Sequence, residues 1–165
     1  MTTPATRMPI VWTIAGSDSG GGAGSQADLH TFQDFRVHGC TVITALTAQN
    51  STQVGLIQEA TPEMIKGQLD LLWQDLAPNV IKLGMLFSKP TMVVIEEFLK
   101  QYQGMVVCDP VMVSTSGDDL LREDAKHFLV SRILPRTDII TPNLLEASKL
   151  IGRKLNSPAK IEKAA

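Results

Sequence analysis

Hydrophobic and polar positions alternate along this chain in blocks that predict strands followed by helices. Nearly continuous apolar runs, which are typical of buried strands, occur at 10–15, 40–48, 80–83, 105–108 and 137–140. Stretches with apolar residues three or four positions apart lie between or after them, at 24–37, 61–76, 88–99, 122–132 and 144–151. A further short run at 54–57 is either a strand or part of an edge hairpin. This alternation predicts an α/β fold, with a mostly parallel sheet covered by helices on both faces.

Several helix ends can be predicted from capping residues. Thr61-Pro62-Glu63 and Ser88-Lys89-Pro90 are typical helix starts. We expect Gly39 to end the first helix and Gly152 to end the helix at 144–151. Ser157-Pro158 would open one more helix. The apolar face of the helix after Pro62 would contain Met64, Ile65, Leu69, Leu72 and Leu76.

Composition narrows the class of protein. The chain has 165 residues, of which 44% are hydrophobic and 19% charged, so one domain with a substantial core is expected at 10–165. A net charge of −2 argues against a basic nucleic-acid surface, and no apolar run is long enough to span a membrane. Cys40 and Cys108 form neither a metal spacing nor a disulfide framework, which favours a cytoplasmic protein. Residues 1–9 lack a signal-peptide pattern and would form a flexible tail.

A glycine-rich turn at 15–28 joins the first strand to the first helix. Glycine permits positive φ and close approach of the backbone to a ligand, and a helix N-terminus offers N–H groups and a positive dipole end. A small anionic or polar ligand is therefore expected at this turn. The alternative is a flexible loop that binds nothing.

Polar residues also follow the other predicted strands. Ligands of open α/β sheets bind beyond the carboxyl ends of the strands. The residues expected along that rim are Gly16, Asp18, Gln49, Asn50, Gly84, Met85, Asp109, Asn143 and Glu146.

Two common phosphate-binding motifs do not explain the glycine turn. A Walker loop requires a lysine after its glycines, and the turn has none. The run at 22–27 fits the dinucleotide pattern G-x-G-x-x-A, but that pattern also requires an acid after the second strand. Ala48-Gln49-Asn50 stands there instead.

The motifs together resemble those of hydroxymethylpyrimidine/phosphomethylpyrimidine kinases. The resemblance extends from about Ile10 to the last residue. It is carried by residues 13–18 (TIAGSD), 22–29 (GAGSQADL), 42–50 (VITALTAQN), 82–86 (KLGML), 109–112 (DPVM) and 140–147 (ITPNLLEA).

The resemblance implies a ribokinase-like fold and an activity. Members of this family use ATP and Mg²⁺ to phosphorylate 4-amino-5-hydroxymethyl-2-methylpyrimidine and then its monophosphate, in thiamine biosynthesis. Homodimers are usual among them. The expected partners of this chain are therefore a small pyrimidine and ATP, with no nucleic acid and no membrane.

The resemblance also assigns residues to the site. Asp28 and Gln49 would hold the aminopyrimidine edge, which suits a carboxylate acceptor and an amide. Gly16, Met85 and Val111 would line the rest of the substrate pocket. Asn143 and Glu146 would bind ATP phosphates, and Asp109 and Glu146 would face the metal ion.

Five of these residues also have a structural interpretation. Asp28 would favour the helix dipole, Gln49 would be a loop amide and Met85 a core side chain. Asp109 would be a turn residue before Pro110, and Glu146 a solvated helix acid. His30, His38 and His127 are expected to be surface residues or otherwise satisfied.

The chain departs from the family in two respects. Ser25 stands where an apolar residue is usual. The Lys-Gly-Gly and Gly-Thr-Gly segments, the second of which supplies the anion hole and the region of the base, do not occur. We therefore expect the N-terminal part of a longer kinase, truncated at the C-terminal side, with the pyrimidine-binding half present and the catalytic base beyond Ala165. The alternatives are a non-catalytic pyrimidine-binding module and a related pyridoxal or sugar kinase.

Overall fold

The computed structural model describes residues 8–112, 121 and 123–155, and its six strands form one sheet in the order β3-β2-β1-β4-β5-β6. The strands are β1 (Ile10–Asp18), β2 (His38–Gln49), β3 (Val54–Glu59), β4 (Val80–Leu83), β5 (Met105–Cys108) and β6 (Ile139–Ile140). The strand pairs are parallel except for β2 and β3, which are antiparallel. The run at 54–57 is thus an edge strand of a hairpin.

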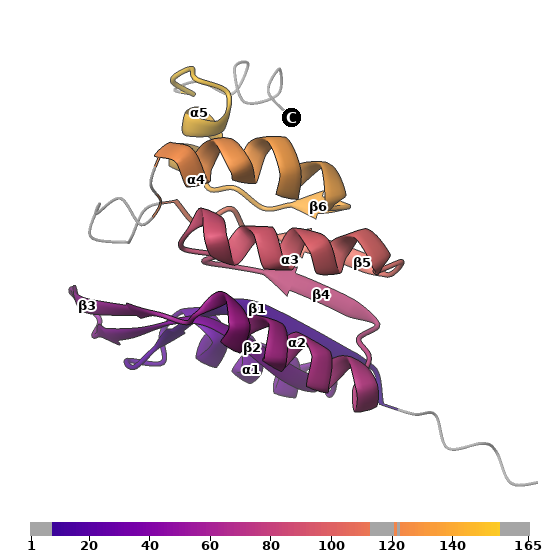
Figure 1. The fold of residues 1–165 in the computed structure, drawn as a ribbon. Helices are drawn as coiled ribbons and strands as arrows, with labels where there is room; N and C mark the ends of the chain where they lie inside the picture. The colour runs from indigo at the N-terminus through magenta and orange to yellow at the C-terminus, as the bar shows by residue number, and fades with distance from the viewer. Residues whose placement is uncertain (1–7, 113–120, 122, 156–165) are drawn as a thin grey trace, which may run out of the picture.

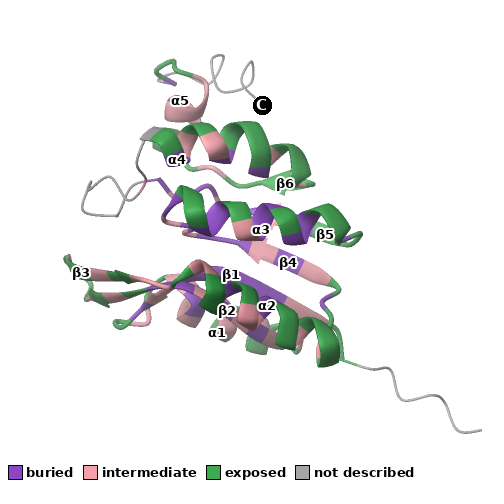
Figure 2. Ribbon diagram, in the orientation of Figure 1, coloured by how far each residue is buried: buried purple, intermediate pink, exposed green. Residues whose placement is uncertain are grey.

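Helices cover both faces of the sheet, which confirms the predicted α/β architecture. They are α1 (Gly24–Asp34), α2 (Pro62–Asp75), α3 (Lys89–Gln101), α4 (Glu123–Phe128) and α5 (Leu144–Leu150). α2, α3 and α4 lie side by side on one face, and α1 lies on the other (Figure 1). Burial is concentrated in the sheet and on the inner sides of the helices (Figure 2).

The predicted capping residues start two helices. The side chain of Thr61 accepts a hydrogen bond from the Met64 backbone N–H, and that of Ser88 accepts one from Thr91. A proline stands in the first turn of each helix. Gly152 has φ 65° just after α5, as expected of a helix-ending glycine.

The prediction for Gly39 was wrong, because this residue lies inside β2. α1 ends earlier, at Asp34, and the chain turns through Arg36 with φ 55°. A Cβ on Gly39 would lie 2.7 Å from Leu29 Cδ2 and 2.9 Å from Phe32 Cδ2. Gly39 is therefore needed for close packing of α1 on the sheet.

The predicted apolar face of α2 was also wrong at one position. Ile65 and Leu69 are buried and Leu72 and Leu76 pack against the core, but Met64 is 60% exposed. Successive helical residues are about 100° apart, so Met64 and Ile65 cannot both face the sheet.

The last part of the chain differs in detail from the prediction. The helix expected at 122–132 is α4 followed by a π-helical turn (Leu129–Ile133) and a 3₁₀ turn (Leu134–Arg136). β6 is shorter than the predicted strand. The tail at 1–7, residues 113–120 and the helix start at Ser157-Pro158 lie outside the described residues.

Candidate active site

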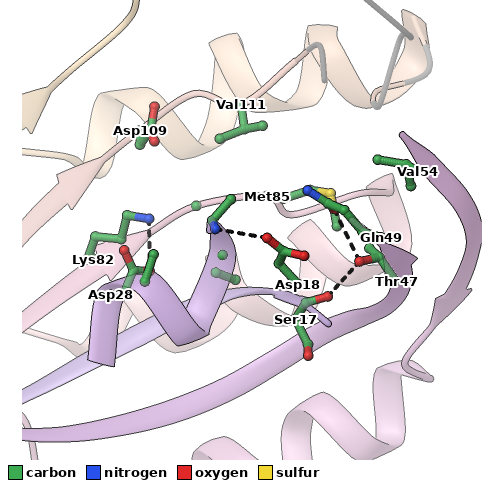
Figure 3. Close-up of a pocket in the computed structure, with 16 residues that line it drawn as sticks. Ser17, Asp18, Asp28, Thr47, Gln49, Val54, Lys82, Met85, Asp109 and Val111 are labelled. Atoms are coloured by element: carbon green, nitrogen blue, oxygen red, sulfur yellow. Dashed lines mark hydrogen bonds and ion pairs between the residues drawn. The ribbon is translucent and has the colours of Figure 1, made fainter. Parts of the chain in front are cut away.

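A cavity of about 370 Å³ opens at the carboxyl ends of the central strands. Its lining includes all five predicted substrate residues, Gly16, Asp28, Gln49, Met85 and Val111, together with Asp109. The remaining lining residues are Ala15, Ser17, Asp18, Ala23, Gly24, Ala27, Thr47, Val54, Lys82 and Gly84. Figure 3 shows the labelled side chains around this cavity.

Asp28 is held by partners from two strands. Its Oδ2 accepts a hydrogen bond from Thr13 Oγ1 at 2.6 Å, and it forms an ion pair with Lys82 Nζ at 2.9 Å. Thr13 belongs to β1 and Lys82 to β4, whereas Asp28 comes from α1. The carboxylate is therefore an integral part of the sheet rim, and the helix-dipole interpretation does not describe its contacts.

Lys82 is a site residue that we did not predict. It stands in the middle of β4, between the buried residues Ile81 and Leu83. A lysine inside a central parallel strand is unusual, because such strands are covered on both faces. That position in an apolar run is the signal that could have identified it.

Gly16 and Met85 form one wall of the cavity. A Cβ on Gly16 would lie 2.3 Å from Met85 Cε, so the methionine occupies space that only glycine leaves. The Met85 carbonyl accepts a hydrogen bond from Thr44 Oγ1 at 2.6 Å. The β1–β2 register shifts between Ala15 and Ser17, which places Gly16 at a bulge in the strand.

Gln49 ends β2 opposite Asp28. Its Oε1 lies 3.2 Å from Thr47 Oγ1, which also donates to the Ser17 carbonyl at 2.9 Å. Figure 3 shows the nitrogen end of the amide directed toward Met85 and the oxygen end toward Thr47. Val54 of β3, which we did not predict, closes this side. Asn50 does not line the cavity, and its side chain accepts hydrogen bonds from Thr52 and Gln53 in the turn that follows.

The glycine turn holds a carboxylate of the chain itself. Asp18 is 5% exposed, and it accepts hydrogen bonds from the backbone N–H groups of Gly20, Gly22 and Ala23 at 2.8–3.0 Å. These N–H groups are therefore satisfied internally. The expectation that the turn serves as a cradle for a ligand anion is corrected at these positions: the turn is an ordered wall of the cavity.

Asp109 follows β5 and faces the cavity across from Asp28. Burial raises the pKa of its carboxyl group, the Lys82 ammonium acts in the opposite direction, and the charge of Asp28 raises the pKa further. The net pKa is above the usual value, as expected for a carboxylate that lacks sufficient positive charge nearby.

Asn143 and Glu146 form a capping box at the start of α5. Asn143 Oδ1 accepts from the Leu145 and Glu146 N–H groups, and Glu146 Oε2 accepts from the Asn143 N–H at 2.9 Å. Neither residue is among the described residues that line the cavity. Their role toward ATP stays a prediction.

Glu146 is nevertheless not a solvated helix acid, because it is only 3% exposed. Burial raises the pKa of its carboxyl group, hydrogen bonds from the Asn143 and Met112 backbones lower it, and the charge of Asp109 raises it. The net pKa is raised. Two acids with raised pKa values, one of which raises the pKa of the other, suit a divalent cation that would neutralise both. Within the described ranges, no group of three or more His, Cys, Asp or Glu side chains forms a metal site.

The remaining candidates lie apart from the cavity. His30, His38 and His127 are exposed, and Cys40 and Cys108 are buried free thiols. Among the helices that the structure describes, none is long and apolar enough to cross a membrane.

The sequence of this chain matches the model of one protein family. The phosphomethylpyrimidine kinase model covers residues 18–165. This chain belongs to the phosphomethylpyrimidine kinase family. Among curated relatives, the hydroxymethylpyrimidine/phosphomethylpyrimidine kinase of Rhizobium meliloti is 45% identical over 146 residues, which are 88% of this chain and 55% of that protein. The chain thus spans about half the length of this phosphomethylpyrimidine kinase relative.

Solved structures agree with the fold of the family. The phosphomethylpyrimidine kinase of Clostridium difficile superposes with a TM-score of 0.88 at 41% identity, covering 94% of this chain and 68% of that one. The pyridoxal kinase of Staphylococcus aureus, solved with pyridoxal, gives 0.85 at 32% identity, covering 96% and 59%. The higher identities and the family model favour the pyrimidine kinases over the pyridoxal alternative.

Proposed function

We propose that this chain carries the pyrimidine-binding part of an ATP-dependent kinase that phosphorylates 4-amino-5-hydroxymethyl-2-methylpyrimidine and its monophosphate in thiamine biosynthesis. The observation that supports this most strongly is the meeting of Gly16, Asp28, Gln49, Met85 and Val111 in one cavity. These residues come from separate parts of the chain. The membership of the family is the second support.

The cavity suits a flat aromatic ring with one polar edge. Asp28 would accept a hydrogen bond from the exocyclic amine, and the Gln49 amide nitrogen would donate one to a ring nitrogen. Met85 and Val111 would contact the apolar faces of the ring. Gly16 leaves the space that Met85 needs for this contact.

Phosphate and metal binding would take place on the Asp109 side of the site. Asp109 and Glu146 would hold Mg²⁺, and the exposed Asn143 side chain would donate from its amide nitrogen to phosphate oxygens. Mg²⁺, when bound, would neutralise charge on the phosphate oxygens of ATP.

Calorimetry with the 165-residue chain tests the binding half of the proposal. The hydroxymethylpyrimidine should bind, and Asp28→Asn should weaken binding at least about tenfold, because the amine loses a charged acceptor. Asp34→Asn is a matched control, since Asp34 is an exposed acid at the end of the same helix. Absence of binding to the unchanged chain would refute this part.

Release of ADP tests the catalytic half. The chain, and a version extended as in its relatives, are each incubated with the pyrimidine, ATP and Mg²⁺. ADP release by the extended version supports the kinase, whereas binding without turnover by both supports a non-catalytic pyrimidine-binding module. A clear preference for pyridoxal in the same assay would contradict the roles assigned to Asp28 and Gln49. Homodimer formation and a cytoplasmic location stay predictions, to be checked by light scattering and cell fractionation.

A further inference from the structure

We propose that Lys82 fixes the orientation of Asp28 and thereby makes the cavity selective for ligands that carry a neutral amino group. This inference rests on the proposed pyrimidine site and adds to it a positioning residue to which the sequence motifs assigned no role.

Lys82 is in a position where a charged side chain must have a specific partner. Its neighbours in β4, Ile81 and Leu83, are fully buried, and the Lys82 side chain is itself only 22% exposed. Its ammonium group reaches Asp28 Oδ2 at 2.9 Å, and the Asp28 side chain is 18% exposed. The ion pair is thus largely buried. Removal of one of its residues is destabilising, because the other charge is then left buried without a partner.

The backbone leaves room for the ammonium group. A Cβ on Gly84 would lie 3.0 Å from Lys82 Nζ and 3.0 Å from the Ala15 side chain. A larger residue at position 84 would therefore require the Lys82 side chain to shift by a few tenths of an ångström. Gly84 therefore leaves space for the Lys82–Asp28 ion pair and also follows the end of β4.

Both partners of Asp28 bind the same oxygen. Thr13 Oγ1 and Lys82 Nζ contact Oδ2, and among the residues that the structure describes no donor bonds to Oδ1. Thr13 is fully buried, so the two contacts fix the carboxylate from the sheet side. Oδ1 is thereby the oxygen that accepts a hydrogen bond from a ligand in the cavity.

The charge of Lys82 also determines which donor is accepted. Because the ammonium group already neutralises Asp28, a cationic amine would gain little from Asp28 and would be repelled by Lys82. A neutral amine, such as the exocyclic amine of an aminopyrimidine, needs only the hydrogen bond. The pair therefore favours neutral aromatic amines over ammonium groups.

Calorimetry with two ligands tests the inference. The probes are 4-amino-5-hydroxymethyl-2-methylpyrimidine and the same compound with hydrogen in place of the 4-amino group. Lys82→Met should weaken binding of the amino compound about tenfold and change binding of the other compound less than about twofold. Lys66→Met is the matched control, because Lys66 forms an ion pair with Asp70 on the exposed side of α2 and is 66% exposed.

A second background separates positioning from general damage. In an Asp28→Asn protein, Lys82→Met should cause no further loss of affinity, because the group it positions is gone. Equal loss for both ligands, or the same loss in both backgrounds, would overturn the role of Lys82 while leaving the proposed function intact. If the unchanged chain binds neither ligand, the proposed function fails, and the selective role of Lys82 fails with it. If Lys82→Met does not fold, Lys82→Gln replaces it in the same comparison.

Discussion

The methyl group of Met85 packs against Gly16 in the wall of the cavity, where a Cβ on Gly16 would lie 2.3 Å from Met85 Cε. We expect Gly16→Ala to push the methionine into the cavity and to weaken pyrimidine binding at least about tenfold. The double variant Gly16→Ala with Met85→Ala should recover part of that loss. Gly67→Ala is the control, because a Cβ at Gly67 meets nothing within 4 Å. Unchanged affinity in Gly16→Ala would contradict the role given to this contact.

Asp18 should be necessary for the order of the glycine turn. Asp18→Asn replaces one acceptor oxygen by a donor that faces backbone N–H groups, so we expect about 2 kcal/mol of lost stability. Hydrogen exchange of the Gly20, Gly22 and Ala23 amides should become faster, as measured by NMR. Asp34→Asn should leave both quantities unchanged. Protection that persists in Asp18→Asn would show that other contacts order the turn.

The ionised carboxyl group of Asp109 should lower the free energy of unfolding at neutral pH. Its pKa is raised above 3.8 in the folded state, so the folded chain binds the proton more tightly than the unfolded chain does. Stability associated with this group is therefore greatest at low pH and decreases as pH rises through the raised pKa. We expect Asp109→Asn to raise the melting temperature at pH 7 by a few degrees, and this gain to vanish below about pH 4.

Thermal unfolding across the pH range measures the Asp109 effect. Asp75→Asn is the control, because Asp75 is an exposed acid at the end of α2. A lower melting temperature for Asp109→Asn at pH 7 would show that its charge stabilises the fold.

Glu96 should show the opposite pH dependence. Burial alone would raise the pKa of its carboxyl group, but Lys100, Arg132 and Arg136 outweigh burial, and the net pKa is lowered from 4.5. Its contribution to stability is therefore present above about pH 4.5 and is lost as pH falls further.

Neighbouring variants isolate the Glu96 effect. Glu96→Gln should cost about 2 kcal/mol at pH 7, because Glu96 is 2% exposed and its cationic partners lose their acceptor. Glu97→Gln should cost far less, since Glu97 is 63% exposed. Denaturant unfolding at pH 7 and pH 3 measures both. Equal losses of unfolding free energy for the two variants would show that the ion pairs of Glu96 with Lys100, Arg132 and Arg136 do not stabilise the fold.

The parts of the fold that could be predicted were those in which one local signal dominates. β4 and β5 have the predicted bounds because each is a short, mostly apolar run between breaks. Gly39 was misread because glycine serves both as a helix stop and as a site of close packing, and only the positions of Leu29 and Phe32 distinguish the two.

The residues of the candidate site also divide into those that a local signal predicts and those that depend on distant contacts. Residues at strand ends, such as Gln49 and Met85, could be predicted because parallel strands bring their carboxyl ends to one rim. Lys82 stands out in the sequence only as a charge inside an apolar run, and its pairing with Asp28, 54 positions away, could not be predicted from that signal. The hydrogen bonds from the backbone N–H groups of the glycine turn to Asp18 could not be predicted either, because they depend on the path of the backbone.

The antiparallel strand β3 makes the two sides of the cavity mechanically unequal. Asp28, Lys82 and Asp109 stand on or beside central strands that are hydrogen-bonded on both sides, whereas Val54 belongs to an edge strand bonded only to β2. Edge elements open at lower free energy than central strands. The charged residues of the cavity are therefore held by central strands, whereas the side that Val54 closes is held by the edge strand β3 and its single partner β2.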